Sequence, residues 1–158
     1  MTPAQQLKAL KKKVEEALGD NPEMDFILDE LPAIIRIRTR LGKGVDEGGS
    51  ITKLDKLSDA YVKVRAKSKL HKDTKTKKSN LTFTGQMLDS IKGERRGMLF
   101  IFGFKGNRAD GKITNDKLAQ YNREKGRPFF KLSKSEESGL RRKITKIIKE
   151  SVKKLFDN

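Results

Sequence analysis

Side chains that could carry out a reaction are few in this sequence. A nucleophile activated by a base, as in serine or cysteine hydrolases, requires a histidine or an equivalent base. The chain has one histidine, His71, and no cysteine. His71 lies among lysines, whose charges disfavour protonation of the imidazole, so we interpret it as a solvated loop residue. The sequence therefore predicts no nucleophile–base pair.

A metal-dependent nuclease would need carboxylates grouped around a divalent ion beside a basic track. The available carboxylates are spaced loosely and form no fixed motif: Asp89, Glu94, Asp110 and Asp116. The segment 103–106 has two glycines but too few elements for a phosphate-binding loop, and it is more typical of a strand end. We expect no enzymatic activity, no metal and no cofactor, and a nuclease ranks last among the alternatives.

Charge is the second source of functional information. Lys and Arg number 37 and Asp and Glu number 21 among 158 residues, which gives a net charge of +16. Such a charge predicts a polyanionic or acidic partner, and it does not by itself separate nucleic acid from an acidic protein surface. The candidate contacts to DNA or to an acidic partner are the densest run of basic residues: Lys63, Arg65, Lys67, Lys69, Lys72, Lys75, Lys77 and Lys78.

Both ends of the chain have helical periodicity. A capping box of Thr2 and Gln5 precedes apolar residues at helical spacing, and a second helix is expected from about 21 to 41, kinked or divided at Pro32. The glycines of 42–49 predict a flexible loop. A capping box of Ser133 and Glu136 begins a final helix over 134–156. Its predicted apolar face contains Leu140, Ile144, Ile147, Ile148, Val152 and Leu155.

Between these helices the sequence predicts a small antiparallel sheet. Residues 98–104 are dense in aromatic and aliphatic side chains, and residues 90–95 are expected to pair with them as a hairpin. Short helices are expected over 56–67 and 115–124, the latter with Leu118 and Tyr121 facing inward. The predicted fold class is α+β, in which N-terminal helices and a long C-terminal amphipathic helix pack on this sheet.

We interpret the chain as a single domain with four parts. These are N-terminal helices over 1–45, a basic loop over 63–79, a sheet region over 80–133 and a C-terminal helix over 134–156. The apolar fraction of 34% is low for a free-standing globule, so part of the apolar surface is expected to be buried only in an oligomer.

The sheet region contains two short motifs about forty residues apart. The first consists of Leu81, Thr84, Gly85, Leu88, Ser90 and Ile91. The second consists of Arg127, Pro128, Phe129, Leu132 and Ser133. In order and spacing they resemble the signature of neck and tail-completion proteins of tailed bacteriophages, including the virion-morphogenesis group. The resemblance covers roughly residues 80–157.

This resemblance implies a structural virion protein that joins the phage head to its tail. It implies a homo-oligomeric ring of six or twelve copies, with portal or adaptor proteins on one side and tail-terminator or tail-tube proteins on the other. Contact with packaged double-stranded DNA would follow if the ring lines the channel. The implied location is the virion neck, after assembly in the host cytoplasm and without a membrane.

The motif residues themselves favour core and turn positions over binding. Arg127 is the exception, because its planar donor fork suits a contact between subunits. The rival interpretation is a free nucleic-acid-binding protein, such as a regulator, that binds duplex DNA with steep salt dependence.

Overall fold

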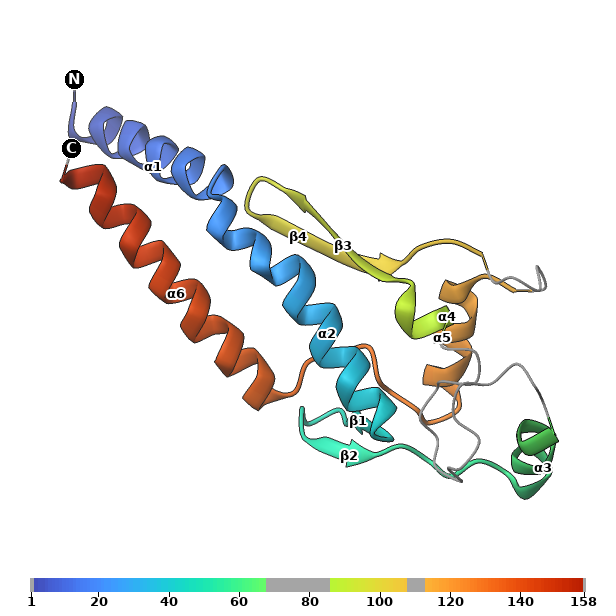
Figure 1. Ribbon diagram of the computed structural model, residues 1–158. Helices are drawn as coiled ribbons and strands as arrows, with labels where there is room; N and C mark the ends of the chain where they lie inside the picture. The colour runs from blue at the N-terminus through green and yellow to red at the C-terminus, as the bar shows by residue number, and fades with distance from the viewer. Residues whose placement is uncertain (1, 68–85, 108–112, 158) are drawn as a thin grey trace.

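The computed structural model describes residues 2–67, 86–107 and 113–157, and its fold is α+β, as predicted (Figure 1). The elements in chain order are α1 (Pro3–Gly19), the 3-10 helix η1 (Pro22–Asp25), α2 (Phe26–Arg40), β1 (Lys43–Val45), β2 (Ile51–Lys53), α3 (Asp59–Lys67), α4 (Gln86–Asp89), β3 (Ile91–Arg96), β4 (Leu99–Phe104), α5 (Asn115–Glu124) and α6 (Lys134–Phe156).

The two longest helices form an arm at one end of the molecule. Helices α1 and α6 lie side by side in opposite directions, so both chain termini are at the same end (Figure 1). Both predicted capping boxes are present. At the start of α1, the Thr2 amide donates to Gln5 Oε1 at 2.8 Å, and the Gln5 amide donates to Thr2 Oγ1 at 3.3 Å. Local signals therefore define where each arm helix begins.

Helix α2 continues the direction of α1 toward the other end of the molecule (Figure 1). The helix runs from Phe26 to Arg40 through Pro32. Of the two outcomes predicted at this proline, the division is therefore wrong and the kink stays a prediction. A proline removes one backbone hydrogen bond. The loss is tolerated because Pro32 is buried and the same helix buries Ile27 and Ile35.

The described strands form two separate antiparallel hairpins. Strands β3 and β4 pair from Ile91↔Phe104 to Arg96↔Leu99, which confirms the predicted hairpin. Strands β1 and β2 pair at 43–45 and 51–53, where only a flexible loop was expected. That prediction was wrong because the glycines serve close packing. A Cβ at Gly44 would collide with the Pro128 carbonyl oxygen, and Gly49 has a φ of +84°.

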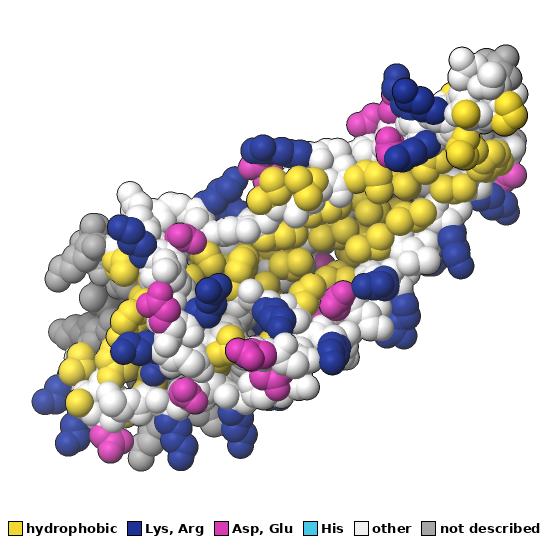
Figure 2. All heavy atoms as spheres, turned by 180° about the vertical axis from the view of Figure 1, so that it is seen from behind, with side chains coloured by type: hydrophobic (Ala, Val, Ile, Leu, Met, Phe, Trp, Pro, Cys, Tyr) yellow, Lys and Arg dark blue, Asp and Glu magenta, His cyan; other side chains and the backbone are white. Residues whose placement is uncertain are grey.

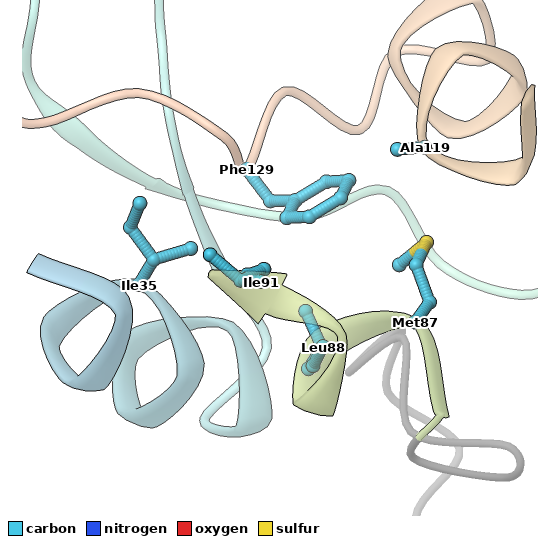
Figure 3. Close-up of a cluster of buried hydrophobic side chains, with 6 residues drawn as sticks. All are labelled: Ile35, Met87, Leu88, Ile91, Ala119 and Phe129. Carbon is cyan, nitrogen blue, oxygen red and sulfur yellow. The ribbon is translucent and has the colours of Figure 1, made fainter. Parts of the chain in front are cut away.

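The principal core lies where α2, α4, β3 and α5 meet (Figure 3). It consists of Ile35, Met87, Leu88, Ile91, Ala119 and Phe129, with Leu31, Phe104 and Leu118 packed against it. Tyr121 is 50% exposed, so its predicted inward orientation is wrong. Asn115, Ala119 and Asn122 are the buried residues on that helix. They share a face that lies ~100° or more around the helix axis from Tyr121.

Candidate functional site

The two sequence motifs meet in the core. Leu88 and Ile91 of the first motif are fully buried, and Phe129 of the second is 1% exposed (Figure 3). The Phe104 ring lies edge-on to Phe129, with ring centroids 6.0 Å apart, and close to Phe130, with centroids 4.7 Å apart. These contacts join the β3–β4 hairpin to the segment before α6, so these motif residues are architectural.

The remaining motif residues end or begin elements around this core. Ser90 Oγ donates to the Met87 carbonyl at 2.7 Å at the end of α4. Ser133, 2% exposed, accepts a hydrogen bond from the Glu136 amide at 3.2 Å and caps α6. The Pro128 carbonyl accepts from the Val45 amide at 2.9 Å, which connects the second motif to β1.

Five motif positions remain. Leu132 is half-buried. Arg127 is half-buried as well, and its Nε atom has no hydrogen-bond partner among the described residues. Its predicted role in a subunit contact stays a prediction. Residues Leu81, Thr84 and Gly85 of the first motif lie outside the described residues.

Two arginines of α2, which the sequence analysis did not single out, hold the two motifs. Arg36 donates to the carbonyls of Leu88 and Ile91, at 3.0 and 2.7 Å. Arg38 is buried and donates to the carbonyls of Phe129 and Lys131, at 2.6 Å each. The available signal was a pair of arginines two positions apart, with Arg36 inside the apolar run 34–37 and Arg38 directly after it.

Arg38 also forms a buried ion pair with Glu136, in the first turn of α6. Burial lowers the pKa of the Arg38 guanidinium, and the nearby Glu136 carboxylate opposes that shift. The same carboxylate accepts from the Ser133 amide at 2.7 Å. One guanidinium thus links α2, the second motif and the capped start of α6.

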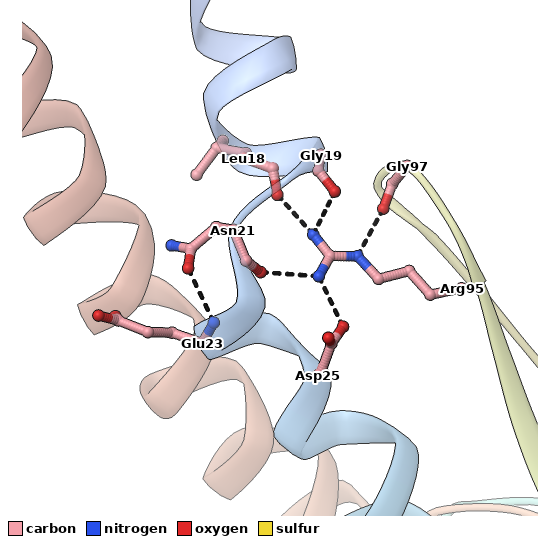
Figure 4. Close-up of polar contacts among 7 residues, drawn as sticks. All are labelled: Leu18, Gly19, Asn21, Glu23, Asp25, Arg95 and Gly97. Atoms are coloured by element: carbon pink, nitrogen blue, oxygen red, sulfur yellow. Dashed lines mark hydrogen bonds and ion pairs between the residues drawn. The ribbon is translucent and has the colours of Figure 1, made fainter.

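A third arginine, also missed by the sequence analysis, fastens the arm to the β3–β4 hairpin (Figure 4). Arg95 donates to the carbonyls of Leu18 and Gly19, at 2.7 and 2.6 Å, at the C-terminus of α1. It also contacts the Asn21 carbonyl and Asp25 Oδ1, each at 2.7 Å. Carbonyls at a helix C-terminus lack intrahelical donors and favour positive charge, so Arg95 satisfies both needs.

The structure describes only part of the predicted basic surface. Lys63 and Lys67 are exposed on α3, so residues 63–67 are helical and do not belong to a loop. Arg65 is 4% exposed, so its guanidinium is not part of an exposed basic surface as predicted. The other predicted contacts lie outside the described residues: Lys69, Lys72, Lys75, Lys77 and Lys78.

The carboxylates considered for a nuclease do not converge where they are described. Asp89 pairs with Arg40 at 2.6 Å, and Glu94 pairs with Arg96 at 2.6 Å. The Arg96 hydrogen bond and charge lower the pKa of Glu94. Within residues 2–67, 86–107 and 113–157, no three His, Cys, Asp or Glu side chains are grouped to hold a metal ion. Over the same residues, no helix is long and apolar enough to cross a membrane.

The most extensive surface feature is apolar. Figure 2 shows hydrophobic side chains forming a continuous band along one face, with Lys and Arg side chains at its margins. Exposed apolar residues occur on both arm helices and on β4, and we call them the exposed apolar surface: Leu7, Leu10, Leu99, Ile101, Leu155 and Phe156. Leu7 is 69% exposed and Phe156 is 65% exposed. Surfaces of this kind mark sites of protein association.

Comparison with known proteins identifies no relative of this chain. No protein-family model, curated protein or solved structure matches it. Its function is therefore inferred from its own residues.

Proposed function

We propose that the chain is a structural subunit of the neck of a tailed-bacteriophage particle, where a ring of identical copies joins the head to the tail. The proposal starts from the two motifs that resemble neck and tail-completion proteins. Their described residues Leu88, Ile91 and Phe129 pack in one core, so the segments that carry the resemblance form one structural unit.

The observation that carries the proposal is the exposed apolar surface of the arm. Of the 17 residues of α1 only Leu18 is buried, and of the 23 residues of α6 only Leu140 is buried. Both helices nevertheless place apolar residues on one face, as at Leu7, Leu10 and Ile144. A second copy of the chain would remove this surface from water, at roughly 25 cal/mol per Å² of apolar area.

The apolar band of Figure 2 supports a ring if it does not dock on itself. Charged side chains lie along the margins of this band. If this surface docks on a different patch of the next copy, the contact is heterologous, and repetition closes a ring when the rotation permits. The net charge of +16 then favours acidic neighbours above or below the ring, such as portal or adaptor and tail-terminator or tail-tube proteins.

Particle joining tests this proposal. Heads and tails assembled without this protein would be mixed with the purified chain and counted as joined or unjoined particles by electron microscopy. We expect the wild-type chain to restore joining. The variant Leu7→Ser/Leu10→Ser should restore it poorly, whereas Lys8→Gln on the same helix serves as a matched surface control. A wild-type chain that leaves heads and tails separate would overturn the proposed function.

A further inference from the structure

The outer face of α6 carries a regular row of basic residues. Arg142, Lys146, Lys149 and Lys153 occur at positions i, i+4, i+7 and i+11. At about 100° per residue, these positions fall within roughly 60° of one another around the helix axis. Ile144, Ile147 and Ile148 are centred on the opposite side. We call these four residues the basic stripe.

The basic stripe is exposed and largely unneutralised. All four residues are exposed, and among the described residues no ion pair involves Arg142, Lys149 or Lys153. Lys146 contacts Glu150 at 3.9 Å. The Lys146 side chain is 78% exposed and the Glu150 side chain 50%, so this ion pair contributes little to stability.

Three basic residues on the flanks of the same helix have acidic partners. Lys143 pairs with Glu30 of α2, and Lys154 approaches Glu23 of η1 at 3.8 Å. Arg141 pairs with Glu137 at 3.0 Å, and this pair is about as exposed as Lys146–Glu150. Three of the four stripe residues have no such partner among the described residues.

Helix α1 provides an internal comparison. Its four lysines are Lys8, Lys11, Lys12 and Lys13, which spread over roughly 200° of the helix surface. Lys11 and Lys12 lie 3.7 and 3.5 Å from Glu15 and Glu16. The four lysines of α1 are therefore dispersed and partly paired, whereas four of the eight basic residues of α6 form one aligned row.

The dimensions of the basic stripe match a nucleic-acid backbone. Eleven residues of helix span about 16 Å, and each strand of duplex DNA places one phosphate about every 3.4 Å along the axis. Four positive charges thus face about five phosphates of one strand. We propose that Arg142, Lys146, Lys149 and Lys153 on α6 bind the phosphate backbone of double-stranded DNA without reading its sequence.

The composition of this face favours DNA over an acidic protein. The row continues toward the helix start through the exposed residues Ser135 and Ser138, and from 135 to 153 it contains no apolar side chain. A stable protein interface has a desolvated apolar centre, which this segment of the face lacks. Lys, Arg and Ser side chains are typical donors to phosphate. This inference does not depend on the proposed ring, because the stripe contains no residue of the exposed apolar surface.

Salt-dependent binding to a labelled duplex of arbitrary sequence tests the stripe. The logarithm of the association constant falls linearly with the logarithm of the salt concentration. Each phosphate that the protein neutralises contributes about −0.9 to the slope of this line. The variant Arg142→Gln/Lys146→Gln/Lys149→Gln/Lys153→Gln should reduce the magnitude of the slope by about 3.6. The control Lys8→Gln/Lys11→Gln/Lys12→Gln/Lys13→Gln removes the same charge and should leave most of the slope intact.

Two further variants separate binding from folding. Lys149→Gln alone, at one exposed position, should reduce the slope by about 0.9. The charge-preserving variant Arg142→Lys/Lys146→Arg/Lys149→Arg/Lys153→Arg should keep the wild-type slope. Equal losses in the α6 and α1 variants would overturn the proposal, since only total charge would then matter. A stripe variant that loses binding to poly-L-glutamate but keeps its DNA slope would also overturn it, in favour of an acidic protein partner.

Discussion

The two ends of this molecule are stabilised in different ways. At the end that contains the motifs, side chains from α2, α4, β3 and α5 surround Phe129, and Leu88 and Ile91 have no exposed surface. In the arm, α1 and α6 bury one residue each and leave apolar side chains in solvent. The motif end is thus packed by contacts within the chain, whereas the exposed apolar residues of the arm are those that a second copy would cover in the proposed ring.

Arginines connect these two ends. Arg38 joins α2 to the start of α6, and Arg95 joins the end of α1 to the β3–β4 hairpin. Both donate to backbone carbonyls of elements that are distant in the sequence. The arm is thus attached by directional hydrogen bonds, whereas the core is stabilised by apolar packing. Substitutions at these two kinds of contact should therefore affect stability differently.

Phe129→Ala should have the largest effect on the motif end. Removing a fully buried phenylalanine costs about 3–5 kcal/mol through lost burial and the cavity left behind. The free energy of unfolding from urea titration measures this loss. Phe130→Ala is the matched control, because Phe130 is 38% exposed and should cost clearly less. Equal losses at both positions would contradict the assignment of Phe129 as the core anchor.

Arg38→Met should lower the free energy of unfolding nearly as much as Phe129→Ala. The substitution leaves the Glu136 carboxylate without its buried partner and frees the carbonyls of Phe129 and Lys131. Breaking a buried pair from one side costs about 3–5 kcal/mol. Urea titration of Arg40→Met provides the comparison, because the Arg40–Asp89 pair is about half exposed and is worth at most about 1 kcal/mol.

Arg95→Met should loosen the arm more than the core. It removes the donors to the C-terminal carbonyls of α1, while Phe129 and its neighbours are untouched (Figure 4). We expect a global loss of about 2 kcal/mol, within the range for hydrogen bonds to charged groups. Amide hydrogen exchange should accelerate in α1 before it changes in β3. Uniform acceleration across both elements would contradict a joint that is local to the arm.

The smallest predicted effect concerns pH at the hairpin surface. Because Arg96 lowers the pKa of Glu94 in the folded chain, the carboxylate contributes stability above its unfolded pKa. That contribution is lost as pH falls from the ordinary value of about 4.5 through the lower folded value. The unfolding midpoints of wild type and Glu94→Gln should therefore converge on acidification. With Arg96 replaced by Gln, the same comparison should show a smaller convergence, because the main cause of the Glu94 shift is gone.

Local sequence signals predicted much of this fold. The capping boxes at Thr2 and Ser133 and the aromatic run before Phe104 predicted the arm helices and the β3–β4 hairpin, because short-range backbone chemistry determines them. The β1–β2 hairpin was missed because Gly44 is required by the distant Pro128 carbonyl. The roles of Arg36, Arg38 and Arg95 were missed for the same reason, since their carbonyl partners are 52 to 93 positions away.

The candidate site was less predictable than the fold. The motifs identified Leu88, Ile91 and Phe129 as core residues, yet only the structure reveals which apolar residues of the arm are exposed, such as Leu7 and Leu155. Periodicity predicts which residues share a face of a helix, but it does not predict whether a neighbour within the same chain covers that face.

The mass of the purified protein in solution, measured by light scattering, tests the central claim most directly. A chain of 17.9 kDa that forms a ring should give a discrete multiple of that mass, either alone or after addition of heads or tails. The variant Leu7→Ser/Leu10→Ser should lower the mass toward 17.9 kDa while urea unfolding of the motif end is unchanged. A wild-type chain that stays at 17.9 kDa under both conditions would contradict the claim that a second copy covers the arm.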